Sequence, residues 1–162
     1  FVNDHWALAQ ELGATGVHLG QEDLLALGDD GRDALLRSGI ALGISSHSLW
    51  ELCRARALSP RYIACGPVWP TLNLRWWNAM AGAPVVAIGG ILQAAQVREA
   101  AACDVSGVCV VRALGADVNT TVPVLTEAFR EGVCATGLMA LPLPHPSLSN
   151  GWGLWPQPGS CP

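Results

Sequence analysis

The sequence contains no lysine, so arginine supplies all nine of its basic side chains. With 13 acidic residues, the formal net charge at pH 7 is -4. Because nucleic acids bind to basic surfaces, we expect no nucleic-acid partner. No apolar run approaches the roughly 18 to 20 residues that a membrane-spanning helix needs. We therefore expect no membrane partner, and a cytoplasmic location is the default expectation.

The six cysteines form no CxxC or CxxH pair of the kind that binds zinc. Cys65 and Cys109 lie inside runs typical of strands, where a thiol acts as a small apolar side chain. We therefore interpret the cysteines as buried or incidental rather than as metal ligands.

The sequence after Glu131 lacks Asp, Glu and Arg, and it holds six of the eleven prolines. Without charge or apolar periodicity, such a stretch cannot build a core. We predict a folded domain over residues 1–131 and disorder over residues 132–162. The segment is either a disordered tail or the product of a disrupted reading frame.

Short runs of β-branched residues recur with a period of about 22 residues, and segments with helical apolar spacing lie between them. The runs cover residues 1–2, 17–19, 40–44, 62–65, 85–88 and 108–111. Six repeats of a strand followed by a helix predict an α/β fold with a parallel sheet, either doubly wound or a barrel.

Small or polar residues follow almost every predicted strand. They are Asn3-Asp4, Gly20 to Asp23, Ser45 to His47, Gly66-Pro67 and Gly89-Gly90. A barrel uses its whole carboxyl rim for function, whereas a doubly wound sheet has one switch point. This distribution favours the barrel.

The segments that end these strands resemble those of the thiamine phosphate synthase family in order and spacing. They read FVND at 1–4, GVHLGQED at 16–23, LGISSH at 42–47, YIACGPVWPT at 62–71 and VAIGGI at 86–91. The resemblance extends to about Arg130. It implies an incomplete TIM (β/α)8 barrel with about six βα units, in which Phe1 belongs to the third strand and the first two strands lie outside this sequence.

The resemblance implies a transferase of thiamine biosynthesis, which joins a hydroxymethylpyrimidine pyrophosphate to a thiazole phosphate and releases pyrophosphate. It identifies Asp4 and Asp23 as Mg²⁺ ligands. Carboxylate oxygens suit this cation, and neighbouring parallel strands about 4.8 Å apart can share one ion. The alternative is that both aspartates cap the helices that follow them.

The resemblance also assigns substrate contacts. Asn3 and Ser45 match positions that contact the pyrimidine pyrophosphate, with a turn or capping role as the alternative. Ser45 and Thr71 match positions with a catalytic role.

For the thiazole phosphate, the resemblance assigns a loop at Gly89 and Gly90, where glycine lets backbone N–H groups approach the phosphate closely. Val111 and Arg112 match the positions that complete this site after the last strand. Arg112 either pairs with the phosphate or points to solvent.

His5, His18 and His47 each stand beside one of these motifs, and for all three a structural role is favoured over a functional one. His18 alternates with apolar strand residues, so we interpret it as a satisfied barrel histidine. Trp76 and Trp77 are interpreted as helix-packing residues.

After Thr71 the sequence departs from the family pattern. About a dozen residues are missing, including a Thr and a Lys of a phosphate-contacting loop. Three hypotheses follow: a transferase whose activity is impaired in this chain, a non-catalytic remnant or phosphate-binding module, and a thiazole tautomerase. Asp4 and Asp23 argue against the tautomerase. Because two sheet edges would be open, we also expect a homo-oligomeric, aggregation-prone or partly folded chain.

Overall fold

The computed structural model describes residues 1–69, 71–115 and 117–135 of the chain. Six parallel strands form one sheet, in which each strand pairs with the next one along the chain. They are β1 (Val2–Asn3), β2 (Gly16–Leu19), β3 (Ala41–Ser46), β4 (Tyr62–Cys65), β5 (Val85–Ile88) and β6 (Gly107–Cys109). The predicted α/β fold with six strand–helix repeats is confirmed. The order has no reversal, which excludes a doubly wound sheet and leaves part of a barrel.

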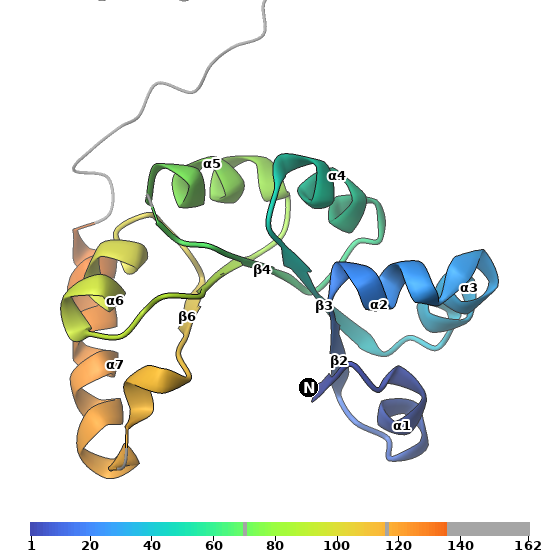
Figure 1. Ribbon diagram of the computed structural model, residues 1–162, viewed down its shortest axis with the longest axis horizontal. Coiled ribbons are helices and arrows are strands. Elements are labelled where there is room, and N and C mark those ends of the chain that lie inside the picture. The colour runs from blue at the N-terminus through green and yellow to red at the C-terminus, as the bar shows by residue number, and fades with distance from the viewer. Residues whose placement is uncertain (70, 116, 136–162) are drawn as a thin grey trace, which may run out of the picture.

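The helices lie along the outer side of the curved sheet (Figure 1). They are α1 (Trp6–Glu11), α2 (Gln21–Ala26), α3 (Gly28–Arg37), α4 (Leu49–Ala57), α5 (Thr71–Ala81), α6 (Ala94–Ala101) and α7 (Val118–Cys134), with a short 3₁₀ helix, η1 (Arg112–Leu114). Two helices, α2 and α3, connect β2 to β3, where the repeat predicts one. Gly28 has a φ of 64°, a left-handed conformation that separates the two helices and that glycine adopts without strain.

The core lies between the sheet and the helices. Alternate strand residues such as Val17, Ile44 and Ile63 are completely buried, and Leu52 and Leu74 meet them from α4 and α5. Burying each of these side chains contributes about 1.5–3 kcal/mol. The residues between them on the strands therefore face the other side of the sheet, where the polar groups gather.

Helix α5 begins at Thr71 itself. The chain thus has no loop between Thr71 and this helix, as expected if the segment after Thr71 is shortened. Trp77 is only 4% exposed and belongs to the core cluster. Its predicted role in helix packing is confirmed, and Trp76 beside it is partly buried.

Helix α7 extends beyond the predicted domain boundary at residue 131 and ends at Cys134. The rest of the predicted disordered segment, residues 136–162, lies outside the described residues. None of the helices in the described ranges is both long enough and apolar enough to span a membrane.

Candidate functional site

The carboxyl ends of β1 and β2 hold Asp4 next to His18. The backbone N–H of Asp4 donates to the carbonyl oxygen of His18 at 2.9 Å, and the Asn3 amide donates to the Asp4 carboxylate at 2.6 Å. Asp4 has a φ of 65°, an uncommon conformation for a residue with a side chain. The amide of Asn3 thus fixes the Asp4 carboxylate at the rim. Capping does not explain Asp4, because the N-cap of α1 is His5.

The carboxyl end of β2 leads into α2, which carries Asp23 in its first turn. One carboxylate oxygen of Asp23 accepts a hydrogen bond from the Gly20 backbone N–H at 3.0 Å. This contact is one half of a capping box, from the third helical residue Asp23 back to the N-cap Gly20, whose lack of a side chain leaves the other half unformed. Asp23 therefore does support the start of its helix, although from a position other than the N-cap.

The carboxylates of Asp4 and Asp23 both influence the pKa of the His18 imidazole. Burial lowers the pKa of His18, and the negative charges of Asp4 and Asp23 partly oppose that shift. In the parts of the chain that the structure describes, no cluster of three or more His, Cys, Asp or Glu side chains could hold a metal. Two carboxylates are nevertheless a donor set that Mg²⁺ accepts when water and substrate phosphate complete its shell. Asp4 and Asp23 fit that mode of binding.

The His18 ring is at the centre of a polar network that spans three strands. Its Nδ1 atom lies 2.8 Å from the Tyr62 hydroxyl, and its Nε2 atom lies 2.8 Å from the Ser45 hydroxyl. The buried Gln21 amide donates to the Ser45 carbonyl at 2.7 Å. His18 is thus a satisfied barrel histidine, as the sequence predicts, and it also holds the Ser45 hydroxyl in place.

Sequence reasoning missed Tyr62, which lies in a run that is otherwise typical of a buried strand. Tyr62 pairs in register with Gly43, and a Cβ atom at Gly43 would collide with its ring. A glycine inside an apolar strand often marks the close approach of another group. Gly43 was therefore the signal that could have revealed a large side chain on this face.

The loop after β5 contains two glycines in left-handed conformations, with φ of 96° at Gly89 and 72° at Gly90. Trp69 Nε1 donates to the Gly90 carbonyl at 3.2 Å, and the Gln96 amide donates to the same oxygen at 3.3 Å. A Cβ atom at Gly90 would lie 3.2 Å from the Trp69 ring. Both the backbone conformation and the space therefore favour glycine at position 90.

Val111 and Arg112 follow β6, the strand next to β5. The glycine loop follows β5, so these two residues come at the end of the strand next to it. Val111 is 76% exposed, and the Arg112 side chain is exposed as well. Among the described residues Arg112 forms no ion pair. Its guanidinium thus faces solvent at this end of the sheet.

Thr71 is engaged elsewhere. Its hydroxyl donates to the Glu99 carboxylate on α6 at 3.2 Å, and its carbonyl oxygen lies 3.7 Å from the Cys103 thiol. Since α5 begins at Thr71, the residue belongs to the helical layer. The structure brings Asn3, Asp4 and Asp23 close to the Ser45 network, but it does not bring Thr71 there.

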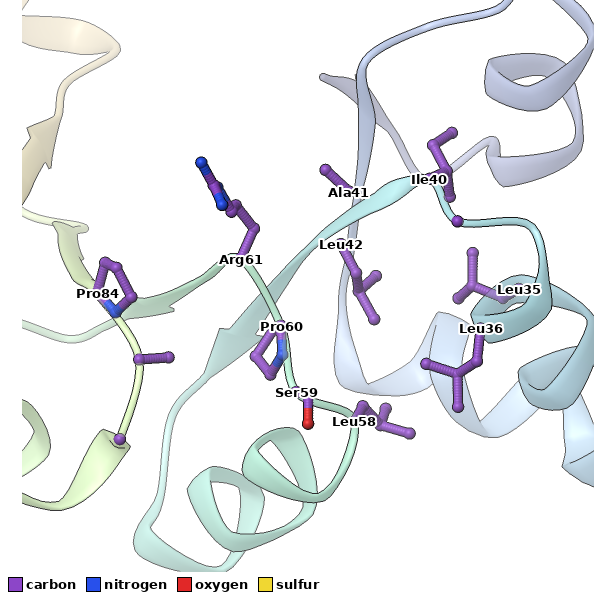
Figure 2. Close-up of a pocket in the computed structure, with 13 residues that line it drawn as sticks. Leu35, Leu36, Ile40, Ala41, Leu42, Leu58, Ser59, Pro60, Arg61 and Pro84 are labelled. Atoms are coloured by element: carbon purple, nitrogen blue, oxygen red, sulfur yellow. The ribbon is translucent and has the colours of Figure 1, made fainter.

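A cavity of about 630 Å³ lies at the opposite end of the sheet, before β3, β4 and β5 (Figure 2). Leu35 and Leu36 of α3 and Leu58, which directly follows α4, form much of its wall, and Arg61 is its one charged lining residue. In Figure 2 the Arg61 side chain points away from Leu35 and Leu36. Ligands of parallel α/β folds bind at the carboxyl ends of strands. This cavity is therefore not the candidate site.

The sheet order and the polar rim define a (β/α)-barrel type of protein with its site at the carboxyl ends of the strands. Residues 1–114 match the family described as "Thiamine monophosphate synthase". The chain belongs to this family.

Three relatives illustrate the match. The "Thiamine-phosphate synthase" of Neisseria meningitidis serogroup A is 42% identical over 134 residues, covering 74% of this chain and 62% of the relative. That of Serratia proteamaculans is 42% identical over 129 residues, covering 70% and 58%. The solved structure "Thiamine phosphate pyrophosphorylase from Pyrococcus furiosus" has a TM-score of 0.71 at 29% identity, covering 82% of this chain and 68% of its own.

The chain spans about 60% of the length of these curated relatives. The Neisseria alignment extends over 134 positions, whereas 74% of this 162-residue chain is about 120 residues. The relative therefore has roughly a dozen residues more within the aligned stretch. That difference agrees with the deletion predicted from the sequence.

Proposed function

We propose that this chain carries part of the active site of a thiamine phosphate synthase-type transferase. The reaction joins hydroxymethylpyrimidine pyrophosphate to a thiazole phosphate and releases pyrophosphate. The observation that carries the proposal is that Asp4 and Asp23 follow the paired strands β1 and β2, at the rim where His18 holds the Ser45 hydroxyl. The names of the relatives, which are thiamine-phosphate synthases, agree with it.

In this proposal Mg²⁺, when bound, neutralises the charge of the departing pyrophosphate. Asp4 and Asp23 would hold the ion, and the Asn3 amide keeps the Asp4 carboxylate oriented. The Ser45 hydroxyl, fixed by His18, would hydrogen-bond the pyrimidine substrate. The N–H groups of the Gly89-Gly90 loop would bind the thiazole phosphate, with Val111 and Arg112 completing that side.

Groups that could stabilise the negative charge of the leaving pyrophosphate, by positive charge or by a hydrogen bond, are scarce. The chain has no lysine, and the Thr71 hydroxyl is bonded to Glu99. Electrostatic stabilisation of the transition state usually contributes more to catalysis than any other effect, and removal of one donor costs roughly 10²- to 10³-fold in rate. We therefore propose that the 162-residue chain alone binds the pyrimidine substrate but forms no thiamine phosphate above the uncatalysed background.

Calorimetric titration with hydroxymethylpyrimidine pyrophosphate, with and without Mg²⁺, tests this function. We expect binding that depends on Mg²⁺ and weakens at least tenfold in Asp4→Asn. Glu22→Gln is the matched control, because Glu22 is an exposed acid next to Asp23 and should leave binding unchanged. Binding that is indifferent to Mg²⁺ and to Asp4→Asn would overturn the transferase proposal.

The second candidate is a non-catalytic phosphate-binding module of the same family, favoured by the left-handed glycine loop. It predicts binding of the thiazole phosphate alone, without any effect of Asp4→Asn. A Gly90→Ala substitution should weaken that binding, because alanine strains the backbone at a φ of 72° and crowds Trp69. The tautomerase remains disfavoured by the paired aspartates.

A further inference from the structure

The glycine loop after β5 is held by two side chains that come from different segments. Trp69 lies between β4 and α5, and its Nε1 donates to the Gly90 carbonyl oxygen at 3.2 Å. Gln96 lies in the first turn of α6, and its amide donates to the same oxygen at 3.3 Å. We call these two side chains the Gly90 clamp. Because a carbonyl oxygen has two lone pairs, the clamp occupies both of its acceptor positions.

Gln96 also occupies the N–H groups that follow the glycines. Its Oε1 atom accepts hydrogen bonds from the backbone N–H of Leu92 at 2.8 Å and from that of Gln93 at 3.1 Å. Gln93 is the N-cap of α6, so these bonds tie the loop to the start of the helix. The N–H groups of Leu92 and Gln93 are therefore not available to a ligand while Gln96 keeps this position.

Three consecutive N–H groups remain at the beginning of the loop. Within the described ranges, the N–H groups of Gly89, Gly90 and Ile91 donate to no other group. A Cβ atom at Gly89 would meet no atom within 4 Å, which leaves open space beside that residue. Ile91 is only 3% exposed, so its side chain anchors the end of this run. Successive N–H groups in a turn can form a concave site that binds anions.

The geometry of one peptide unit links the clamp to these donors. The Gly90 carbonyl and the Ile91 N–H belong to a planar trans peptide and therefore point in opposite directions. By holding the oxygen, the clamp directs the Ile91 N–H away from Trp69 and Gln96. A glycine at position 90 could otherwise rotate this peptide, since glycine adopts both signs of φ without strain. Rotation would turn the carbonyl oxygen toward a bound phosphate, and the oxygens would repel each other.

We propose that Trp69 and Gln96 are positioning residues for the phosphate of the thiazole substrate. The clamp holds the peptide between Gly90 and Ile91 in one orientation. The N–H groups of Gly89, Gly90 and Ile91 then bind the phosphate together. This inference rests on the proposed function, which assigns the thiazole phosphate to the glycine loop, and it makes the clamp necessary for that binding.

An NMR titration of the isotope-labelled full chain with the thiazole phosphate identifies the donors. We expect downfield shifts of the amide protons of Gly89, Gly90 and Ile91, because a hydrogen bond to phosphate deshields the proton. The amide protons of Leu92 and Gln93 should keep their positions, since the clamp continues to hold them. Larger shifts at Leu92 and Gln93 than in the glycine pair would overturn the proposal, because the phosphate would then have displaced the clamp.

Two substitutions remove the clamp donors one at a time. Trp69→Phe keeps an aromatic ring but loses the Nε1–H, and Gln96→Met keeps the side-chain length but loses the amide. Each should weaken thiazole phosphate binding at least fivefold and abolish the shift of the Ile91 amide. Affinity for the thiazole alcohol, which lacks the phosphate, should change less than twofold. Trp76→Phe and Gln10→Met are the controls and should bind like the parent, since Trp76 is partly buried like Trp69 and Gln10 is exposed on α1.

Failure of the clamp and failure of the proposed function give different results. Unchanged thiazole phosphate affinity in both clamp variants, or an equal loss for the thiazole alcohol, overturns the clamp alone. A parent chain that does not bind the thiazole phosphate overturns the clamp and the phosphate role of the loop, whereas the Mg²⁺-dependent test at Asp4 is unaffected. Binding of the thiazole phosphate without any binding of the pyrimidine substrate overturns the transferase and supports the clamp. Amide spectra outside the loop report whether each variant folds, and the titration of the parent tests the donors without any substitution.

Discussion

The Nε2 atom of His18 lies 2.8 Å from the hydroxyl oxygen of Ser45 and thereby links β2 to β3 through their side chains. The other ring nitrogen is 2.8 Å from the Tyr62 hydroxyl on β4. One imidazole therefore joins three consecutive strands. Which nitrogen carries the proton decides which hydroxyl donates and which accepts.

Replacing His18 with alanine should destabilise the fold. The substitution leaves the Ser45 and Tyr62 hydroxyls without their shared partner, at a cost of about 1–3 kcal/mol. Urea unfolding followed by circular dichroism measures the loss. His5→Ala is the control, because His5 is exposed and its replacement should stay within about 0.5 kcal/mol. Similar values for both variants would contradict a structural role of the network.

The pairing of Gly43 with Tyr62 predicts a steric effect. Gly43→Ala should cost about 1–3 kcal/mol, because the new methyl group collides with the tyrosine ring. The double variant Gly43→Ala, Tyr62→Ala should lose less than the two single changes together. Gly107→Ala is a strand control, since its Cβ atom would be an ordinary 3.7 Å from Val86. Additive losses in thermal or urea unfolding would refute the collision.

Asp23→Ala separates two roles of one carboxylate. Loss of the hydrogen bond from the Gly20 N–H to the Asp23 carboxylate should lower the free energy of unfolding by about 1 kcal/mol. We expect Mg²⁺ with inorganic pyrophosphate to raise the melting temperature of the parent chain, and loss of a metal ligand should abolish that rise. Glu22→Ala should change neither quantity. If Asp23→Ala destabilises the chain but the Mg²⁺ response persists, capping is its whole role.

The cysteines should react with thiol reagents in two groups. Burial raises the pKa of the Cys65 thiol to about 12, so at pH 8 almost none of it is thiolate. Burial also raises the pKa of Cys103, whereas Cys53 and Cys134 are exposed. Peptide mass spectrometry after brief alkylation should find Cys53 and Cys134 modified first. Modification of Cys65 at the same rate in the folded chain would show that β4 is not buried.

The transferase assay gives a further prediction. The purified 162-residue chain, supplied with both substrates and Mg²⁺, should form no thiamine phosphate above the uncatalysed background. The physical reason is the scarcity of positive charge for departing pyrophosphate in a chain without lysine. Product formation by the chain alone would show that other groups stabilise that charge.

The strands could be predicted from the sequence because parallel strands, buried on both faces, produce continuous β-branched runs. The runs at 62–65 and 85–88 match β4 and β5 in full. The run at 108–111 does not match, since β6 ends at Cys109 and the chain turns toward η1. Val110 and Val111 suit a strand by residue type, but local propensity does not fix where strand pairing ends.

The candidate site was partly predictable. Strand ends place Asn3, Asp4 and Ser45 at one rim, and this follows from parallel topology alone. The engagement of Thr71 with Glu99 did not follow, because it depends on α5 beginning at Thr71 and packing near α6. The hydrogen bonds of Tyr62 were also missed, since an aromatic residue in a strand run is equally typical of a core.

The sequential strand order also governs how the chain folds. Paired residues of neighbouring strands are 15 to 25 positions apart in the sequence, so no pairing closes a long loop, and contact order stays low for a parallel sheet. Folding can then begin at one pair and extend outward in both directions, as in a repeat protein. If it begins at β3 and β4, substitutions there slow folding, whereas substitutions at β1 or β6 mainly accelerate unfolding.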